Sequence, residues 1–253
     1  ANPAARAGIT GAGSGIGRAL AVRFHAEGAK KIIAVDINLS NAEDTATMVN
    51  GLAMMADVAK EDDIARIIED TEANVGPIDL FCSNAGIGIG KNIDEPDEVW
   101  QTIWEVNTMA HVWAARHLVP LMIARGGGYL LNTSSAAGLL NQIGSVTYAV
   151  TKHAAVALAE WLSITYGDQG IKVSVLCPQA VNTPLIAGGA GVAGVDGMIE
   201  PEVAVEAVVE TLREEKFLVL PHPEVAEYMK RKAADYDRWL KGMRRLQSQY
   251  VKD

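Results

Sequence analysis

Short apolar runs alternate with longer segments of helical periodicity along nearly the whole chain. Runs such as KIIAVDI and IKVSVLCP are almost continuously apolar, which is typical of parallel strands buried on both faces. Between such runs lie segments such as EDDIARIIEDTEANVG, in which Ile64, Ile67 and Ile68 recur at helical spacing and Gly76 and Pro77 end the helix. This alternation predicts βαβ units and a mostly parallel sheet covered by helices on both faces.

The same pattern predicts the size of the sheet and the number of domains. We expect about seven strands in one Rossmann-type, doubly wound α/β sheet, and a single domain over residues 1–253, because no repeat or linker interrupts the chain. The longest helices are expected at 100–124 and 145–167. The expected strands lie within the segments AGIT, KIIAVDI, GLAMMADV, IDLFCSNAG, GYLLNTSS, IKVSVLCP and KFLVLP.

Two segments depart from the alternation. Residues 184–200 are rich in Gly and follow the sixth strand, so we expect a flexible loop over a ligand; an ordinary surface loop is the alternative. Residues 222–253 mix apolar side chains with many charges. We expect them to form a helical tail that packs on the body of the protein or on a neighbouring subunit.

Charge, hydropathy and cysteine content argue against several classes of function. The chain has 253 residues and a net charge of −9, whereas nucleic-acid binding usually requires a basic face. No apolar run reaches the roughly 18 residues of a membrane span, so neither a nucleic acid nor a membrane is an expected partner. Cys82 and Cys177 fall in predicted buried strands, and no metal-ligand spacing is present. We therefore expect free thiols, a cytoplasmic location and no metal site.

A Gly-rich turn near the N-terminus predicts a dinucleotide site. TGAGSGIG at 10–17 lies between the first strand and the first helix, where the backbone can approach a pyrophosphate and the helix N-terminus presents its amides; a purely structural turn is the alternative. Contacts to the cofactor are also expected from residues that follow the third and fourth strands. The expected set is Gly11, Gly13, Ser14, Gly15, Ile16, Gly17, Asp57, Val58, Asn84, Ala85 and Gly86.

The choice between NAD and NADP depends on Asp36, which ends the second strand. A carboxylate there can accept hydrogen bonds from both ribose hydroxyls of the adenosine, and it repels a 2′-phosphate. Neither Ser14 nor Ile37 supplies a cation to offset that repulsion. We therefore expect NAD as the cofactor, although an Asp at the end of a strand can also simply cap a turn.

Ser135, Tyr148 and Lys152 carry the predicted chemistry. The four-residue spacing places Tyr148 and Lys152 on one helix face, where the ammonium is expected to lower the pKa of the phenol from about 10. Ser135 ends the fifth strand and can hold the oxygen of a substrate. Such a set can move a proton on or off an alcohol near neutral pH.

A second Tyr–Lys pair has the same spacing. Tyr228 and Lys232 lie in a charged segment, and Glu215 stands where the serine is required. We interpret this pair as part of a solvated amphipathic helix, and we expect Tyr228→Phe to leave turnover nearly intact.

The combined motifs resemble the short-chain dehydrogenase/reductase family over essentially the whole chain. TGAGSGIG is similar to the family's cofactor turn, NAG at 84–86 to the motif that steadies its central sheet, and CPQAVNT to a segment that holds the nicotinamide carboxamide. In that last segment the resemblance implies contacts from Val181 and Thr183. One position departs from the family pattern, because Gln179 stands where a Gly is usual, and its side chain is expected to face the substrate.

The resemblance also implies a catalytic tetrad of Asn107, Ser135, Tyr148 and Lys152. Tyr148 exchanges the proton and Ser135 binds the substrate oxygen, so these two residues and Gln179 are the expected substrate contacts. Lys152 lowers the Tyr148 pKa and binds the nicotinamide ribose, which makes Tyr148 and Lys152 cofactor contacts as well. Asn107 places a water that links Lys152 to solvent.

The expected function is therefore NAD-dependent hydride transfer between the cofactor and a secondary alcohol or ketone. The residues expected near the substrate are apolar or small, which favours a hydrophobic or cyclic substrate. A 3-oxoacyl-thioester reductase is one alternative, but such enzymes normally use NADPH and Asp36 disfavours it. A non-catalytic nucleotide-sensing protein is another, but all four catalytic positions are present. The resemblance further implies a homodimer or homotetramer.

Overall fold

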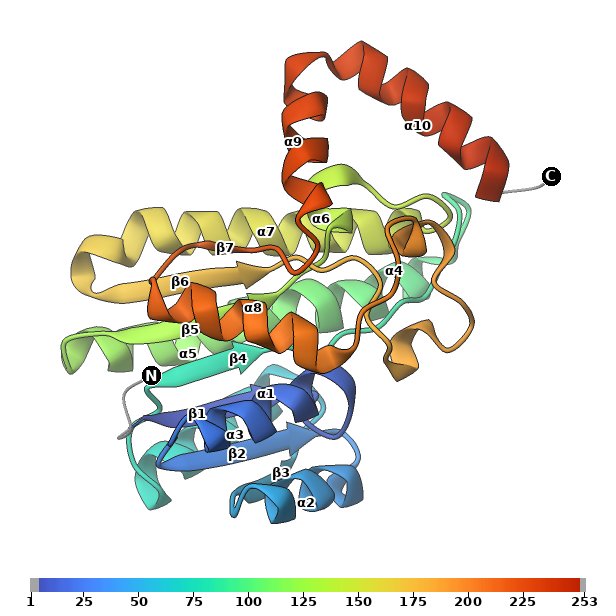
Figure 1. Ribbon diagram of the computed structural model, residues 1–253. Helices are drawn as coiled ribbons and strands as arrows, with labels where there is room; N and C mark the ends of the chain where they lie inside the picture. Colours follow the sequence, from blue (N-terminus) through green and yellow to red (C-terminus); the bar gives the residue numbers. More distant parts are fainter. Residues whose placement is uncertain (1–4, 251–253) are drawn as a thin grey trace.

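A seven-stranded parallel sheet runs through the centre of the computed structural model, which describes residues 5–250 (Figure 1). Its strands are β1 (Arg6–Thr10), β2 (Lys31–Asp36), β3 (Leu52–Met55), β4 (Leu80–Ser83), β5 (Gly128–Thr133), β6 (Ile171–Leu176) and β7 (Leu218–Val219). In space they follow the order β3-β2-β1-β4-β5-β6-β7, and every adjacent pair is parallel. The predicted doubly wound α/β fold is confirmed, although β7 is shorter than the segment KFLVLP predicts.

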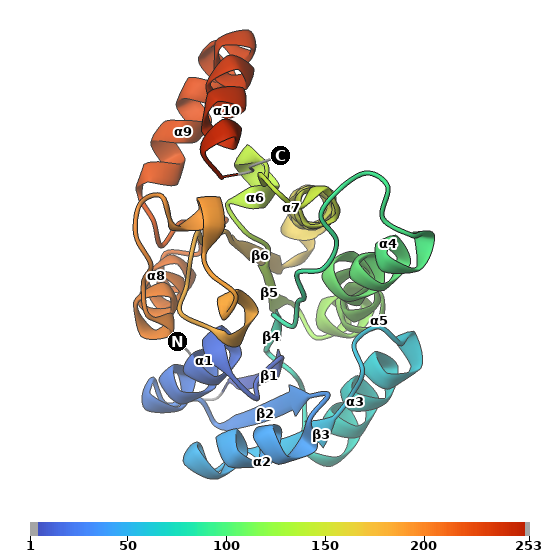
Figure 2. The same ribbon diagram turned by 90° about the vertical axis from the view of Figure 1, so that its right-hand side faces the viewer.

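Helices cover both faces of this sheet. The longer ones between the strands are α1 (Gly15–Ala26), α2 (Leu39–Met48), α3 (Glu61–Asn74), α5 (Ala110–Ala124), α7 (Val146–Tyr166) and α8 (Pro201–Arg213). Figure 2 shows α1, α2 and α8 on one face of the sheet and α3, α5 and α7 on the other. Ile32 and Ala34 of β2 pack into an apolar cluster with the first set of helices, whereas Ile33 and Val35 pack into a cluster with the second set. Successive strand residues point to opposite faces, so a strand buried on both sides must be apolar throughout.

The chain reverses its direction of travel across the sheet between β3 and β4, which leaves β1 and β4 side by side at the centre. The loops that follow these two strands turn toward opposite faces, and a crevice opens between them. Asn84 closes the base of this crevice: its amide nitrogen donates to the Thr10 carbonyl at 3.1 Å, and its amide oxygen accepts from the Thr133 hydroxyl at 3.1 Å. One side chain thus joins β1, β4 and β5.

The helix expected at 100–124 is interrupted. It starts earlier, as α4 (Asp97–Trp104), and continues through a π-helical turn, η1 (Glu105–Met109), before α5. Asn107 lies in this turn and is completely buried. Its side chain accepts from the Ile87 N–H and donates to the Ile87 carbonyl, both at 2.9 Å. The turn therefore ties the long helix to the loop after β4, and such turns occur frequently at functional sites.

The Gly-rich segment and the tail complete the molecule. Residues 184–200 form a loop with two short 3₁₀ turns, and Val181 pairs with Ile199 across its base. Two further helices follow β7: α9 (Glu224–Ala234), which stands on the short helix α6 (Ala137–Leu140), and α10 (Tyr236–Tyr250), which turns back above the body (Figure 1). Residues 251–253 of the expected tail lie outside the described residues. Among residues 5–250, no helix combines the length and the apolar character needed to cross a bilayer.

Candidate active site

A cavity of about 660 Å³ lies over the carboxyl ends of the central strands. It brings together nearly all of the residues that the sequence marks for cofactor binding and catalysis. Gly13, Gly17 and Asn107 do not line it, and instead support residues that do. The predicted residues that line the cavity are Gly11, Ser14, Gly15, Ile16, Asp36, Asp57, Val58, Asn84, Ala85, Gly86, Ser135, Tyr148, Lys152, Gln179, Val181 and Thr183.

The Gly-rich turn leaves the first amides of α1 open toward this cavity. A Cβ atom on Gly17 would collide with the carbonyl oxygen of Gly11, so only Gly lets the helix pack directly on the turn. Ser14 precedes the helix, is exposed and makes no capping hydrogen bond with its side chain. The unpaired amides at a helix N-terminus carry a partial positive charge that favours a phosphate group.

The Asp36 carboxylate is held at the edge of the cavity by backbone amides. One oxygen accepts from the Gly13 N–H at 2.8 Å and the other from the Asn38 N–H at 3.0 Å. A Cβ on Gly13 would lie 2.7 Å from the Asp36 carboxylate, so this contact also requires Gly. Arg18, the basic residue that directly follows the Gly-rich turn, donates to the Thr45 hydroxyl at 3.0 Å and to the Gly13 carbonyl. The turn thus orients Asp36, and Arg18 makes no ion pair with it.

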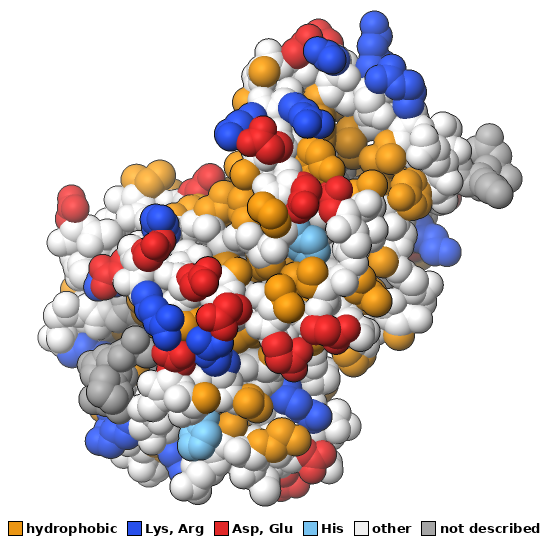
Figure 3. Space-filling model, in the orientation of Figure 1, with side chains coloured by type: hydrophobic (Ala, Val, Ile, Leu, Met, Phe, Trp, Pro, Cys, Tyr) orange, Lys and Arg blue, Asp and Glu red, His pale blue; other side chains and the backbone are white. Residues whose placement is uncertain are grey.

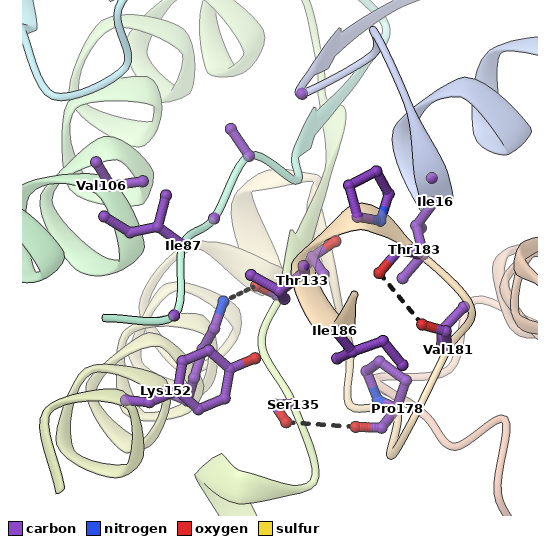
Figure 4. Close-up of a pocket in the computed structure, with 18 of the residues that line it drawn as sticks. Ile16, Ile87, Val106, Thr133, Ser135, Lys152, Pro178, Val181, Thr183 and Ile186 are labelled. Atoms are coloured by element: carbon purple, nitrogen blue, oxygen red, sulfur yellow. Dashed lines mark hydrogen bonds between the residues drawn. The ribbon is translucent and has the colours of Figure 1, made fainter. Parts of the chain in front are cut away.

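Asn107 and Lys152 approach the same point of the loop after β4. A Cβ on Gly86 would lie 3.3 Å from the side-chain oxygen of Asn107 and 3.3 Å from the Lys152 ammonium. The Lys152 ammonium donates to the Thr133 carbonyl at 3.2 Å (Figure 4). Both polar atoms of the Asn107 side chain are already hydrogen bonded, to Ile87 and, at 3.3 Å, to the Thr151 hydroxyl. Asn107 therefore holds the loop in place with its side chain.

Tyr148 and Ser135 meet at the other end of the cavity. Ser145 caps α7 by accepting from the Tyr148 N–H at 3.4 Å, which places Tyr148 in the first turn and Lys152 one turn later. The Lys152 ammonium lies 5.5 Å from the centre of the Tyr148 ring. Ser135 accepts from the Ala137 N–H at 3.1 Å and donates to the Pro178 carbonyl at 3.3 Å (Figure 4). The Tyr148 phenol, the Ser135 hydroxyl and the Lys152 ammonium thus lie around the same part of the cavity.

Known proteins are similar to this chain in sequence and in fold. The family model described as short chain dehydrogenase matches residues 5–189, which is most of the chain. The chain belongs to the short-chain dehydrogenase family.

Two relatives and one solved structure illustrate the similarity. The chain is 36% identical to 1-deoxy-11-beta-hydroxypentalenate dehydrogenase of Streptomyces exfoliatus, over 83% of this chain and 80% of that protein. It is 34% identical to human (Homo sapiens) epidermal retinol dehydrogenase 2, over 84% of this chain and 72% of that protein. A short-chain dehydrogenase/reductase from Burkholderia phymatum, solved in complex with NAD, superposes with a TM-score of 0.84 at 25% identity, over 92% of this chain and 94% of that one.

The pKa values in this short-chain dehydrogenase correct one prediction. Burial raises the pKa of Tyr148 above its usual 10, and the nearby Ser135 hydroxyl only partly opposes this effect. Burial also lowers the pKa of Lys152 to about 8. The sequence predicts a lowered Tyr148 pKa, but in the structure the ammonium faces the Thr133 carbonyl and the loss of hydration dominates both groups.

Gln179 belongs to a hydrogen-bond network that the sequence does not reveal. Its amide nitrogen donates to the Asp196 carboxylate at 2.9 Å, and the other oxygen of Asp196 accepts from the Tyr228 hydroxyl at 2.9 Å. Lys232 donates to the Leu139 carbonyl at 2.6 Å. The interpretation of Tyr228 and Lys232 as a solvated pair is therefore wrong, because both hydrogen bond to the body of the protein. Asp196 is the only charged residue between Thr183 and Glu200, which is the one signal in the sequence that marks it.

Proposed function

We propose that this protein transfers a hydride between NAD and a secondary alcohol or ketone. One observation carries the proposal: Ser135, Tyr148 and Lys152 line the same cavity as the Gly-rich turn and Asp36. The fit of a dinucleotide is supported by the open amides of α1 and by the glycines whose Cβ atoms would obstruct the turn. When bound there, the nicotinamide ring supplies the hydride acceptor or donor.

The residues of the chain would supply the rest of the chemistry. Ser135 and Tyr148 bind the substrate oxygen between their hydroxyls. In oxidation the Tyr148 phenolate takes the alcohol proton, and in reduction the phenol returns it to the ketone oxygen. Because burial raises the Tyr148 pKa, the phenolate needs a neighbouring positive charge, which the Lys152 ammonium provides when protonated. Asn107 supports this set through its hydrogen bonds to Ile87.

The Asp36 carboxylate supports NAD over NADP. Its oxygens are oriented by the Gly13 and Asn38 amides, at the position where the ribose of the adenosine is expected. A 2′-phosphate would bring two negative charges together there. NADPH should therefore bind at least about tenfold more weakly than NADH, measured by titrating nucleotide fluorescence. Equal or tighter binding of NADPH would contradict the role given to Asp36.

Both relatives named above are, by their names, dehydrogenases of alcohols on largely hydrocarbon skeletons. The substrate space of this protein includes Leu185 and Ile186 of the Gly-rich loop. These features support a hydrophobic or cyclic substrate. By the family resemblance we also propose that the protein is cytoplasmic and forms a homodimer or homotetramer. Light scattering on the purified protein would measure its mass and so test the number of subunits.

Tyr148→Phe tests the catalytic part of the proposal. With NAD⁺ and a panel of cyclic and aliphatic secondary alcohols, and with NADH and a 3-oxoacyl thioester, loss of the phenol should lower kcat by at least about 100-fold. The dissociation constant for NADH should stay within about twofold, because the ring remains. Tyr166→Phe is the matched control, since Tyr166 lies on the same helix and its hydroxyl makes no hydrogen bond within the described residues. Turnover that survives in Tyr148→Phe would refute the assignment.

A further inference from the structure

A second cavity adjoins the first and has no role in the chemistry described so far. Its volume is about 740 Å³, and it lies between α9–α10 and the body. Ser135, Gln142, Gln179 and Ala193 line both cavities, so the second one opens beside the proposed catalytic serine. Much of its wall is apolar, and Figure 3 shows hydrophobic side chains gathered in the recess beneath α10. Its larger apolar lining residues are Leu140, Val192, Val195, Trp239, Met243 and Leu246.

The arginines of the protein divide into two groups. Each of the seven from Arg6 to Arg213 donates a hydrogen bond to a carboxylate, a hydroxyl or a backbone carbonyl. The four on α9 and α10 make no side-chain hydrogen bond and no ion pair with any residue between 5 and 250. Three of these four, Arg231, Arg238 and Arg245, line the second cavity, and the fourth, Arg244, does not.

Resting on the proposed function, we infer that the second cavity binds the anionic end of the substrate: a carboxylate or phosphate on a mainly apolar alcohol or ketone. The apolar wall would take the hydrocarbon part, and Ser135 and Tyr148 would take the oxygen that reacts. The unpaired guanidinium groups would take the anion, because a guanidinium binds two oxygens of such a group at once.

The surrounding charges favour this assignment. The protein carries a net charge of −9, so an anionic substrate needs a local concentration of positive charge to bind. Among residues 5–250, Asp235 is the one carboxylate that lines the second cavity, against three arginines. The Arg231 guanidinium lies 5.8 Å from the centre of the Tyr228 ring, which orients it at the cavity wall. An uncharged substrate would give these three exposed arginines nothing to bind.

Binding is the first test, because it does not require turnover. The protein is titrated with hexanoate, decanoate and dodecanoate and with the neutral amide of each. Binding is followed by the quenching of tryptophan fluorescence, to which Trp239 in the cavity wall contributes. At least one carboxylate should bind about tenfold more tightly than its amide, and raised salt should reduce the difference. Alkyl phosphates of the same lengths distinguish a carboxylate site from a phosphate site. No difference between the acids and the amides, or no binding of either, overturns the inference.

Substitutions then locate the site. Arg238→Gln and Arg245→Gln should each weaken carboxylate binding by about five- to tenfold and leave amide binding unchanged. Arg244→Gln is the matched control, because Arg244 likewise has no hydrogen-bond or ion-pair partner within residues 5–250 and lies on the same helix but outside the cavity. An effect of Arg244→Gln as large as that of Arg238→Gln would mean that the helix attracts anions without a site, and the inference would fail.

Kinetics separate this inference from the proposed function. For secondary alcohols that carry a carboxylate, such as 12-hydroxyoctadecanoate, the Arg238→Gln variant should raise KM by about five- to tenfold with kcat unchanged, and the methyl ester should show no such change. If no alcohol in the panel is oxidised while the charge-selective binding persists, the proposed function fails and the binding site stands. If alcohols are oxidised with equal preference for acid and ester, the binding site fails and the proposed function stands.

Discussion

His111 lies fully inside the protein, in the first turn of α5, and neither of its ring nitrogens has a hydrogen-bond partner among the described residues. Burial, with a smaller effect of the Lys152 ammonium, lowers its pKa to about 3. The residue is therefore neutral in the folded protein near neutral pH. A buried polar group without a partner costs free energy, and the proposed catalytic lysine is near enough to His111 to contribute to its lowered pKa.

His111 should make the protein sensitive to acid. Its pKa is lower in the folded state than in the unfolded state, so protonation adds no cost to stability above about pH 6.5 and an increasing cost as the pH falls below that value. At pH 5 the loss should be about 2 kcal/mol relative to pH 7.5. Urea unfolding of the wild type and of His111→Leu at both pH values measures this loss. The difference between the two pH values should be about 2 kcal/mol smaller in the variant, and the remainder includes the effect of His222, whose pKa is also lowered by burial. An identical pH dependence in the two proteins would contradict this assignment.

At the scale of elements, patterns within a short stretch of sequence predict those strands, turns and motifs that depend only on residues close together in the chain. The buried parallel strands are predictable because they are continuous apolar runs. The Gly-rich turn and the pair of Tyr148 and Lys152 are predictable because each is a short motif. The π-helical turn at Asn107 was not predictable, because it depends on hydrogen bonds to Ile87 on another segment. The contact between Asp196 and Tyr228 was missed for the same reason, since it joins a loop to a helix 32 positions away.

The Tyr228–Asp196 hydrogen bond should hold the Gly-rich loop over the substrate. In Tyr228→Phe, Asp196 loses one of its two partners, so KM for the substrate should rise by about three- to tenfold while kcat and NADH binding change by less than about twofold. Tyr236→Phe is the control, because that ring is exposed and its hydroxyl makes no hydrogen bond within residues 5–250. A large fall in kcat would mean that Tyr228 takes part in the chemistry after all.

At the scale of the whole molecule, the two cavities are formed by different parts of the fold. The predicted cofactor contacts lie between Gly11 and Thr183, on the loops that follow the strands, at the end of β2, and on α1 and α7. The second cavity depends on α10, no residue of which is fully buried and which contacts mainly α9. The sequence predicted the first site through recognisable motifs. It predicted a helical tail but not the cavity beneath it, because that cavity arises only when α10 folds back over the body.

Removal of α10 should therefore separate the two sites. A chain that ends at Asp235 should bind NADH with an unchanged dissociation constant and lose only a few degrees of thermal stability, since few apolar contacts disappear. The KM for hydrophobic alcohols should rise, because the second cavity loses a wall. Calorimetry and steady-state kinetics measure both effects. Loss of NADH binding would show that α10 supports the whole fold.

The central pairing of the sheet sets the order in which the protein can form during synthesis. The Arg6 N–H at the start of β1 donates to Asp79, 73 residues further along, and Ala7 pairs with Leu80 of β4. At a translation rate of about 5–20 residues per second, β1 waits several seconds with one edge unpaired, and an unpaired edge invites association with other chains. The nascent chain is therefore most in need of a chaperone before β4 emerges, and no nucleotide can assist it until then, because the crevice does not yet exist.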